Sequence, residues 1–182
     1  MHLQVHNSDR VATDVAEGTC DVGFVEAPRV PSTLHQVVVA RDELVVVVHP
    51  AHRWARRRRP LTAAELAGTP LLVREPGSGT RTTLDTALQA HDRAEPLLEL
   101  GSAAAIRTSV LTGTGPAVMS TLAVAEHVRT GQLCVVDVAG VELRRTLRAV
   151  WTGPRRLLGP AGDLVHLARG HHPRDEPVAP RP

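Results

Sequence analysis

Apolar and polar positions along the chain follow two periods. Leu3 and Val5 alternate with polar neighbours, as in a half-buried strand, whereas the apolar residues after Ser8–Asp9 recur at helical spacing until Gly18. Further apolar runs predict strands over residues 21–25, 36–40, 44–49, 70–73, 97–100, 117–119, 133–136 and 143–151. Helices are predicted between them, over residues 62–68, from the turn after 73 to about 90, and over 102–112, 121–129 and 162–169. This alternation is typical of an α/β fold, with a parallel or mixed sheet covered by helices.

The composition is that of a globular protein with an aliphatic core. Apolar residues make up 42% of the chain and charged residues 22%, which is ordinary for a folded domain. Phe24, Trp54 and Trp151 are the only aromatic residues besides histidine, so the core has to be built from Val, Leu, Ala and Ile. The length of 182 residues allows one domain or two small lobes. Residues 171–182 are polar and rich in Pro, which predicts a disordered tail.

Charge and cysteine content favour a reduced, cytoplasmic protein. The formal net charge of +2 does not by itself indicate a nucleic-acid partner. Cys20 and Cys134 are the only cysteines and show no metal-type spacing, so we expect two free thiols. The first five residues lack the character of an export signal, and the longest apolar stretch, residues 44–48, is far too short to span a membrane. We therefore expect no membrane association.

The clearest binding chemistry lies in Leu71–Arg81, where a predicted strand runs through a glycine-containing turn into a helix. Unpaired backbone N–H groups at a helix start favour an anion, and small residues allow the anion to approach them. Ser78 and Thr80 add hydroxyl donors on either side of Gly79, and Arg81 could add a full charge. The alternative is that Ser78 merely caps the helix. The G-x-x-x-x-G-K-[ST] spacing of a nucleotide-binding P-loop is absent.

Two later helix starts, at Gly101-Ser102 and Ser120-Thr121, carry the same hydroxyl chemistry. All three starts follow strands, so in a parallel sheet they gather at one edge, where open α/β sheets bind ligands. A serine taken alone at such a place is more often just a cap. Thr62–Glu65, for example, reads as a capping box that opens a short helix without any ligand. The convergence of the three starts is what favours a binding site.

Signals for other chemistry are weak, and we expect no catalytic residues, no metal and no cofactor. No serine has the G-x-S-x-G spacing of a nucleophile elbow. His166, His171 and His172 could form a metal site, but a solvated helix end and tail is the better interpretation. The basic run Arg53–Pro60 could contact phosphates, although a loop of solvated arginines is the more common outcome.

An ordered set of motifs resembles the effector-binding domain of LysR-type transcriptional regulators, which is similar to type 2 periplasmic binding proteins. Val15–Glu26 matches the family's V-x-x-G-x-x-D-x-G-[FI] strand, and Arg41–His52 matches its D-E-L-V-x-V-x-P-x-H-P crossover. Arg74–Arg81 matches the R-E-x-G-S-G-T-R of the branch around the CysL and CbbR regulators. Residues 98–102, 113–120 and 131–133 match later blocks, so the resemblance covers residues 1 to about 170.

The resemblance implies two α/β lobes with mixed sheets, joined by two crossover strands. Lobe I comprises residues 1–48 and 152–170, and lobe II comprises residues 49–151. A small effector, commonly an anion, is expected in the cleft between the lobes, where its binding shifts the lobes of a DNA-bound tetramer. The expected effector-binding residues are Ser78, Gly79, Thr80, Arg81, Ser102 and Ser120 from lobe II, with Val25 and Glu26 from the edge of lobe I.

The sequence also departs from the family pattern. Nothing in it matches the family's helix-turn-helix or linker helix, so we expect no direct DNA binding by this chain alone. The family's first lobe I strand and helix are missing too, which leaves residues 3–5 and 21–25 to pair directly or to stay unpaired. The chain is thus expected to be the sensor module of a regulator, in a homodimer or paired with an intact regulator. The alternative is a stand-alone cytoplasmic protein that binds small anions or dimerises with intact regulators.

Overall fold

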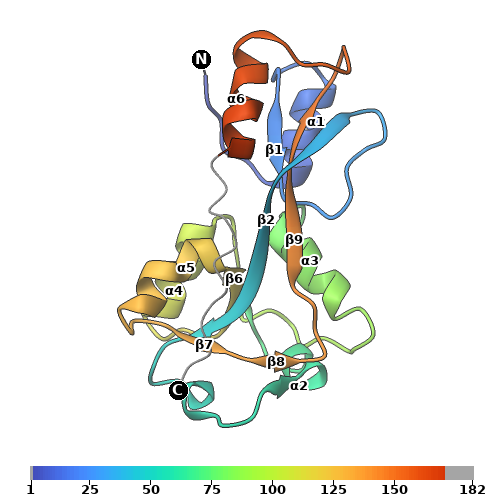
Figure 1. Ribbon diagram of the computed structural model, residues 1–182. Coiled ribbons are helices and arrows are strands. Elements are labelled where there is room, and N and C mark those ends of the chain that lie inside the picture. The colour runs from blue at the N-terminus through green and yellow to red at the C-terminus, as the bar shows by residue number, and fades with distance from the viewer. Residues whose placement is uncertain (1, 171–182) are drawn as a thin grey trace.

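Two long antiparallel strands join two α/β lobes in the computed structural model, which describes residues 2–170 (Figure 1). These strands are β2 (His35–Val48) and β9 (Arg144–Trp151), and we call the pair the crossover ribbon. β2 pairs with β9 over its first part and with β6 and β7 over its last part, so it carries the sheet from one lobe into the other. The sheet has seven strands in the order β1-β9-β2-β6-β4-β5, with β7 also paired to β2.

Lobe I consists of α1 (Ser8–Ala16), β1 (Gly23–Val25) and α6 (Gly159–Gly170), packed around one end of the crossover ribbon (Figure 1). β1 runs antiparallel to β9 and forms the edge of the sheet among the described residues. Successive residues of β9 point to opposite faces, so Val150 packs with Val15 of α1, whereas Ala149 packs with Val165 of α6. The two helices therefore cover the two faces of a small sheet.

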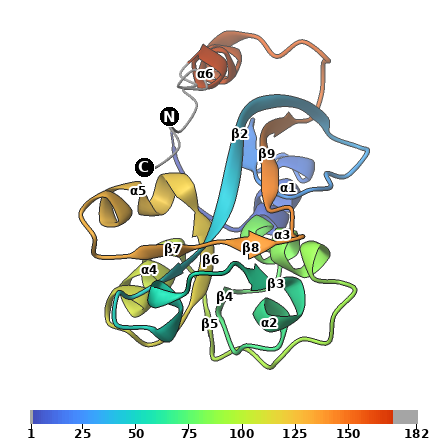
Figure 2. The same cartoon turned by 60° about the horizontal axis from the view of Figure 1, so that its bottom comes forward.

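Lobe II is built on three parallel strands, each of which leads into a helix. The strands are β4 (Leu72–Arg74), β5 (Leu98–Leu100) and β6 (Ala117–Ser120). The helices that follow them are α3 (Gly79–Ala87), α4 (Ala103–Leu111) and α5 (Thr121–Arg129). The other elements, seen in Figure 2, are η1 (Arg53–Arg56), β3 (Leu61–Thr62), α2 (Ala63–Ala67), β7 (Cys134–Val136) and β8 (Val138–Ala139). Because the three strands are parallel, the starts of α3, α4 and α5 gather at one edge.

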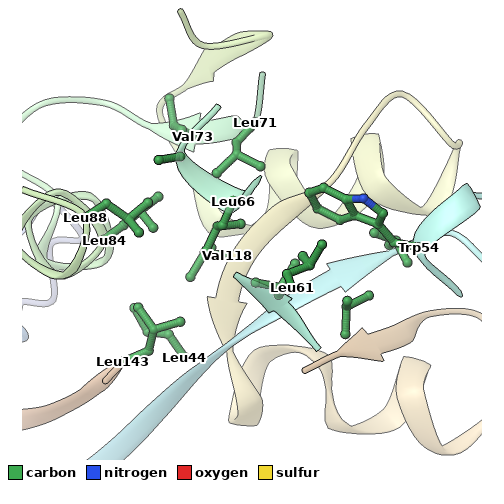
Figure 3. Close-up of a cluster of buried hydrophobic side chains, with 14 residues drawn as sticks. Leu44, Trp54, Leu61, Leu66, Leu71, Val73, Leu84, Leu88, Val118 and Leu143 are labelled. Carbon is green, nitrogen blue, oxygen red and sulfur yellow. The ribbon is translucent and has the colours of Figure 1, made fainter. Parts of the chain in front are cut away.

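The largest apolar core lies in lobe II and is aliphatic apart from one tryptophan (Figure 3). Leu61, Leu66 and Leu88 are fully buried in it, and Trp54 packs beside them. The capping box of Thr62–Glu65 is present and starts α2, which directs Leu66 into this core. The prediction of that helix start from the sequence is confirmed.

Most predicted strands and helices are present, and the differences at their ends have local causes. The two strands predicted over residues 36–40 and 44–49 form the single strand β2, with an irregularity between Val38 and Ala40. Asn7, rather than Ser8 or Asp9, caps α1 by accepting a hydrogen bond from the Arg10 backbone. Ser8 is buried instead, because it faces the rest of lobe I.

One local prediction is wrong. Leu3 and Val5 form no strand and are 82% and 86% exposed, because β1 pairs with β9 and no strand among the described residues lies beside them. The arginines of the run Arg53–Pro60 are all exposed, as predicted, although the run also contains η1, buries Trp54 and binds Arg57 to Glu65. The predicted tail, residues 171–182, lies outside the described residues. The lobe boundaries at 48/49 and 151/152 remain predictions, since β2 and β9 each run through both lobes.

Candidate ligand-binding site

A hollow of about 350 Å³ lies between the lobes, where helix starts of lobe II meet the crossover ribbon and the edge of lobe I. We call it the interlobe hollow. It combines an apolar wall with a few polar groups that converge from both lobes, as small-molecule sites commonly do. Its lining residues are Glu26, Asp42, Arg74, Thr80, Ala103, Ile106, Val118, Met119, Ser120, Leu122, Ala123, Arg145 and Leu147.

Three of the residues predicted from the sequence line this hollow, namely Glu26, Thr80 and Ser120. Ser120 Oγ caps α5 by accepting from the Leu122 backbone at 3.2 Å, and donates to Asp42 Oδ1 at 3.0 Å. Thr80, in the first turn of α3, accepts a hydrogen bond from Arg145 Nη1 at 2.9 Å. Side chains from both lobes and from the ribbon therefore meet at this point.

The other five predicted residues lie nearby without lining the hollow as residues 2–170 form it. Ser78 is buried and makes no capping hydrogen bond with its side chain. Gly79 packs directly against the backbone of Glu26. The remaining three are Ser102, which caps α4 through the Ala105 backbone at 3.1 Å, Val25, which is buried in the core of lobe I, and Arg81, which pairs with Asp85 at 2.9 Å.

Sequence reasoning missed two charged residues of the ribbon that dominate the hollow. Arg145 of β9 lies opposite Asp42 of β2, and their side chains are only 4% and 1% exposed. Arg145 Nε and Nη2 donate to Asp42 Oδ2 at 2.8 and 2.7 Å. The signal in the sequence was strand alternation, which turns residue 145 inward between the outward residues 144 and 146. A charged side chain at an inward position needs a partner, so this pattern indicated a buried ion pair.

Arg74 supplies a second guanidinium at the end of β4. Its Nε and Nη2 donate to the two carboxylate oxygens of Glu75 at 2.8 and 2.9 Å. Burial works to raise the pKa of Glu75, but the ion pair with Arg74 and hydrogen bonds, including one from Asn7, outweigh it and hold that pKa below its ordinary value. The polar end of the hollow thus contains two arginines, each already paired with a carboxylate.

Lobe I also contacts lobe II directly beside the hollow, at the turn before α3. The Asp9 backbone donates to the Gly77 carbonyl at 3.1 Å, and Asn7 Nδ2 donates to the Pro76 carbonyl at 3.4 Å. Gly77 has φ +85°, a conformation that favours glycine, and this turn presents both carbonyl groups to α1. The start of α3 is therefore a contact surface between the lobes as well as a helix start.

A larger groove of about 900 Å³ lies beside the ribbon and is lined by the residues that alternate with those of the hollow. We call it the outer groove. Arg41 and Glu43 of β2 and Arg144, Thr146 and Arg148 of β9 line it, whereas Asp42 and Arg145 reach both spaces. The interlobe hollow is the better candidate despite its smaller volume, because the helix starts and the edge of lobe I converge there.

The family assignment rests on a match over nearly the whole chain. Residues 1–173 match the family described as LysR substrate binding domain. The chain belongs to this family. The match confirms the resemblance drawn from the ordered motifs, and relatives of the chain include HTH-type transcriptional regulators.

Two relatives of this LysR substrate-binding domain are longer regulators. It is 51% identical over 170 residues to an uncharacterized HTH-type transcriptional regulator of Mycobacterium tuberculosis, a match covering 91% of this chain and 54% of that protein. It is 33% identical over 168 residues to the HTH-type transcriptional regulator CbbR of Xanthobacter flavus, covering 91% of this chain and 50% of that protein. The chain therefore spans about half the length of these relatives.

The two-lobed fold of the LysR domain is confirmed by comparison with a solved structure. The regulatory domain of CcmR from Synechocystis, determined in complex with 2-PG, superimposes with a TM-score of 0.78 at 20% sequence identity. The superposition covers 93% of this chain and 81% of that one. Similarity at this level of identity concerns the fold alone.

Other features predicted from the sequence can also be located. Cys20 and Cys134 are free, in lobe I and at the start of β7. His166 lies on α6, while His171 and His172 fall outside the described residues, and residues 2–170 bring no three metal-ligating side chains together. None of the helices in this part of the chain is long and apolar enough to cross a membrane.

Proposed function

We propose that this LysR substrate-binding domain is the sensor of a transcription regulator and that its effector is a small anion bound in the interlobe hollow. The observation that carries the proposal is the meeting of Arg145 Nη1 and Thr80 Oγ1, at 2.9 Å, at the start of α3. A guanidinium, a hydroxyl and a helix start each favour an anion, and they act at one place. That CcmR, which shares the fold, was solved in complex with 2-PG is consistent with a small ligand.

The proposed effector contacts are Arg145, Arg74, Thr80 and Ser120, because these polar residues line the hollow. Ser78 and Gly79 contribute the backbone of the helix start rather than their side chains. Ser102, Arg81 and Val25 act less directly: Ser102 fixes the start of α4, Arg81 donates to the Arg74 carbonyl at 3.1 Å, and Val25 anchors the edge of lobe I.

We further propose that the domain works in the cytoplasm as a homodimer or paired with an intact regulator. Residues 2–170 are proposed to make no sequence-specific contact with DNA. The strongest basic run, Arg53–Pro60, contains only the four-residue η1, which buries Trp54, and pairs Arg57 with Glu65 at 2.7 Å, whereas a groove is read by a longer helix or by strands.

The test of the proposed function is a thermal-shift screen of small carboxylates, phosphate and sulfate, followed by calorimetry on the anion that stabilises most. Thr80→Val should weaken binding of that anion about tenfold or more, because a charge-assisted hydrogen bond is worth roughly 1.5–3 kcal/mol. The matched control is Thr86→Val, the same change on the same helix but facing the outer groove. Loss of affinity in Thr86→Val with none in Thr80→Val would place the ligand in the outer groove and refute the proposal.

A further inference from the structure

One side of the Arg145 guanidinium is fixed by buried partners. Its Nε and Nη2 donate to Asp42 Oδ2, and the other oxygen of Asp42 accepts from Ser120 Oγ at 3.0 Å. Both side chains of this pair are almost fully buried, at 4% and 1% exposure. Because the pair joins β2, β9 and the start of α5, it sets the orientation of the guanidinium.

The remaining nitrogen, Nη1, has partners of a different kind. It donates to Thr80 Oγ1 of lobe II at 2.9 Å and to Glu26 Oε2 of lobe I at 2.6 Å. The Glu26 side chain is 40% exposed, ten times as much as that of Arg145. A solvent-accessible carboxylate from the opposite lobe thus occupies the position at which an anionic ligand would meet Arg145 and Thr80.

The backbone of Glu26 is held in place independently of its carboxylate. Its N–H donates to Ser8 Oγ at 3.0 Å. Its carbonyl group lies so close to Gly79 that a Cβ at residue 79 would be 2.7 Å from the Glu26 carbonyl carbon. The carboxylate is therefore free to leave Arg145 by rotation of a half-exposed side chain, without movement of β1.

From this arrangement we propose that the Glu26 carboxylate is a built-in competitor of the anionic effector. The inference rests on the proposed function and gives Glu26 a role opposite to that of an effector ligand. The anionic group of the effector takes the position at Arg145 Nη1 and Thr80 Oγ1, and the Glu26 side chain rotates into solvent. Asp42 keeps the guanidinium in place throughout. Effector binding thereby breaks an ion pair that ties lobe I to lobe II.

The test is calorimetric titration with inorganic phosphate and, in parallel, with succinate. Glu26→Gln keeps the shape of the side chain and removes its charge, so the Kd for the anion should fall about threefold to fivefold, the scale expected for a partly exposed ion pair. The matched control is Glu43→Gln, which removes the same charge at a residue of β2 that lines the outer groove and not the interlobe hollow. Its Kd should stay within about twofold of the wild-type value, because solvent screens exposed charges.

The possible outcomes separate the two claims. If Glu26→Gln binds the anions as well as the wild type, or less well, while Thr80→Val still weakens binding, the competitor role is refuted and the proposed site survives. If neither anion binds the wild type or any variant, the proposed function is refuted and the competitor role with it. Should Glu26→Gln fail to give a cooperative melting curve, Glu26→Ala carries the same expectation of tighter binding.

Discussion

The starts of α3 and α4 are similar in the sequence and different in the structure. Each follows a parallel strand and has a Gly-Ser pair, Gly77-Ser78 before α3 and Gly101-Ser102 before α4. Ser102 caps its helix, and a Cβ at Gly101 would meet nothing within 4 Å. Ser78 is 2% exposed with no side-chain cap, and the next residue, Gly79, presses against Glu26 of the other lobe.

The comparison shows that one sequence pattern serves two purposes. The start of α4 is complete by itself, because its own serine satisfies the backbone. The start of α3 is a docking surface for lobe I, and its hydroxyl Thr80 is engaged by Arg145 rather than by its own helix. Tertiary contact, not local sequence, decides which of these two helix starts docks against the other lobe.

The largest expected difference in stability between the two helix starts comes from replacing a glycine at each of them, Gly79 or Gly101, with alanine. Gly79→Ala should lower the free energy of unfolding by about 1–3 kcal/mol, or the Tm by roughly 2–12 °C, since the added Cβ would overlap Glu26. Gly101→Ala has open space around it and should leave the Tm unchanged. Equal melting temperatures for the two variants would show that lobe I does not rest on the start of α3.

A smaller difference in stability is expected when the serine before each helix is replaced with alanine. Ser102→Ala removes a capping hydrogen bond of 3.1 Å and should cost about 1 kcal/mol of stability. Ser78→Ala removes no cap and should cost less than Ser102→Ala in the same urea titration. The reverse order would mean that the hydroxyl of Ser78, and not the contact with lobe I, stabilises the start of α3.

The smallest effect on stability is expected at the start of α2, where Thr62 and Glu65 cap each other. This helix start serves as the reference for one that local sequence determines. The hydrogen bond from the Thr62 backbone, together with Arg57, lowers the pKa of Glu65 below its ordinary value of 4.5. The stabilisation is therefore present above that value and is lost as the pH falls through the lowered pKa of the folded protein. Glu65→Gln should be slightly less stable than the wild type at neutral pH, with the difference vanishing in acid. A difference that persists unchanged in acid would contradict this.

Local signals account for what the sequence could predict. The capping box at Thr62–Glu65, the strand–helix alternation and the ordered motifs each involve residues close together in the chain, and all are found in the structure. The strand predicted from the alternation at Leu3 and Val5 is absent from the structure, because a strand needs a partner, which local sequence does not specify. The prediction divided β2 into two strands because the polar residues 41–43 interrupt its apolar pattern, whereas in the structure they pair with β9 within one continuous strand.

The candidate site was predicted only in part for the same reason. Thr80 and Ser120 could be found because helix starts after parallel strands have a known position in such folds. The pairing of Asp42 with Arg145 could not be predicted, because the two residues are 103 positions apart and meet only once β2 and β9 are in register. The contact between Glu26 and Gly79 depends in the same way on how one lobe rests on the other.

A crystal structure with the most stabilising anion bound would test the central claim most directly. The account predicts an oxygen of that anion within hydrogen-bonding distance of both Arg145 Nη1 and Thr80 Oγ1, in the interlobe hollow, with the Glu26 carboxylate turned away. An anion bound instead in the outer groove, beside Arg144 and Arg148 and with the pair of Arg145 and Glu26 intact, would contradict it.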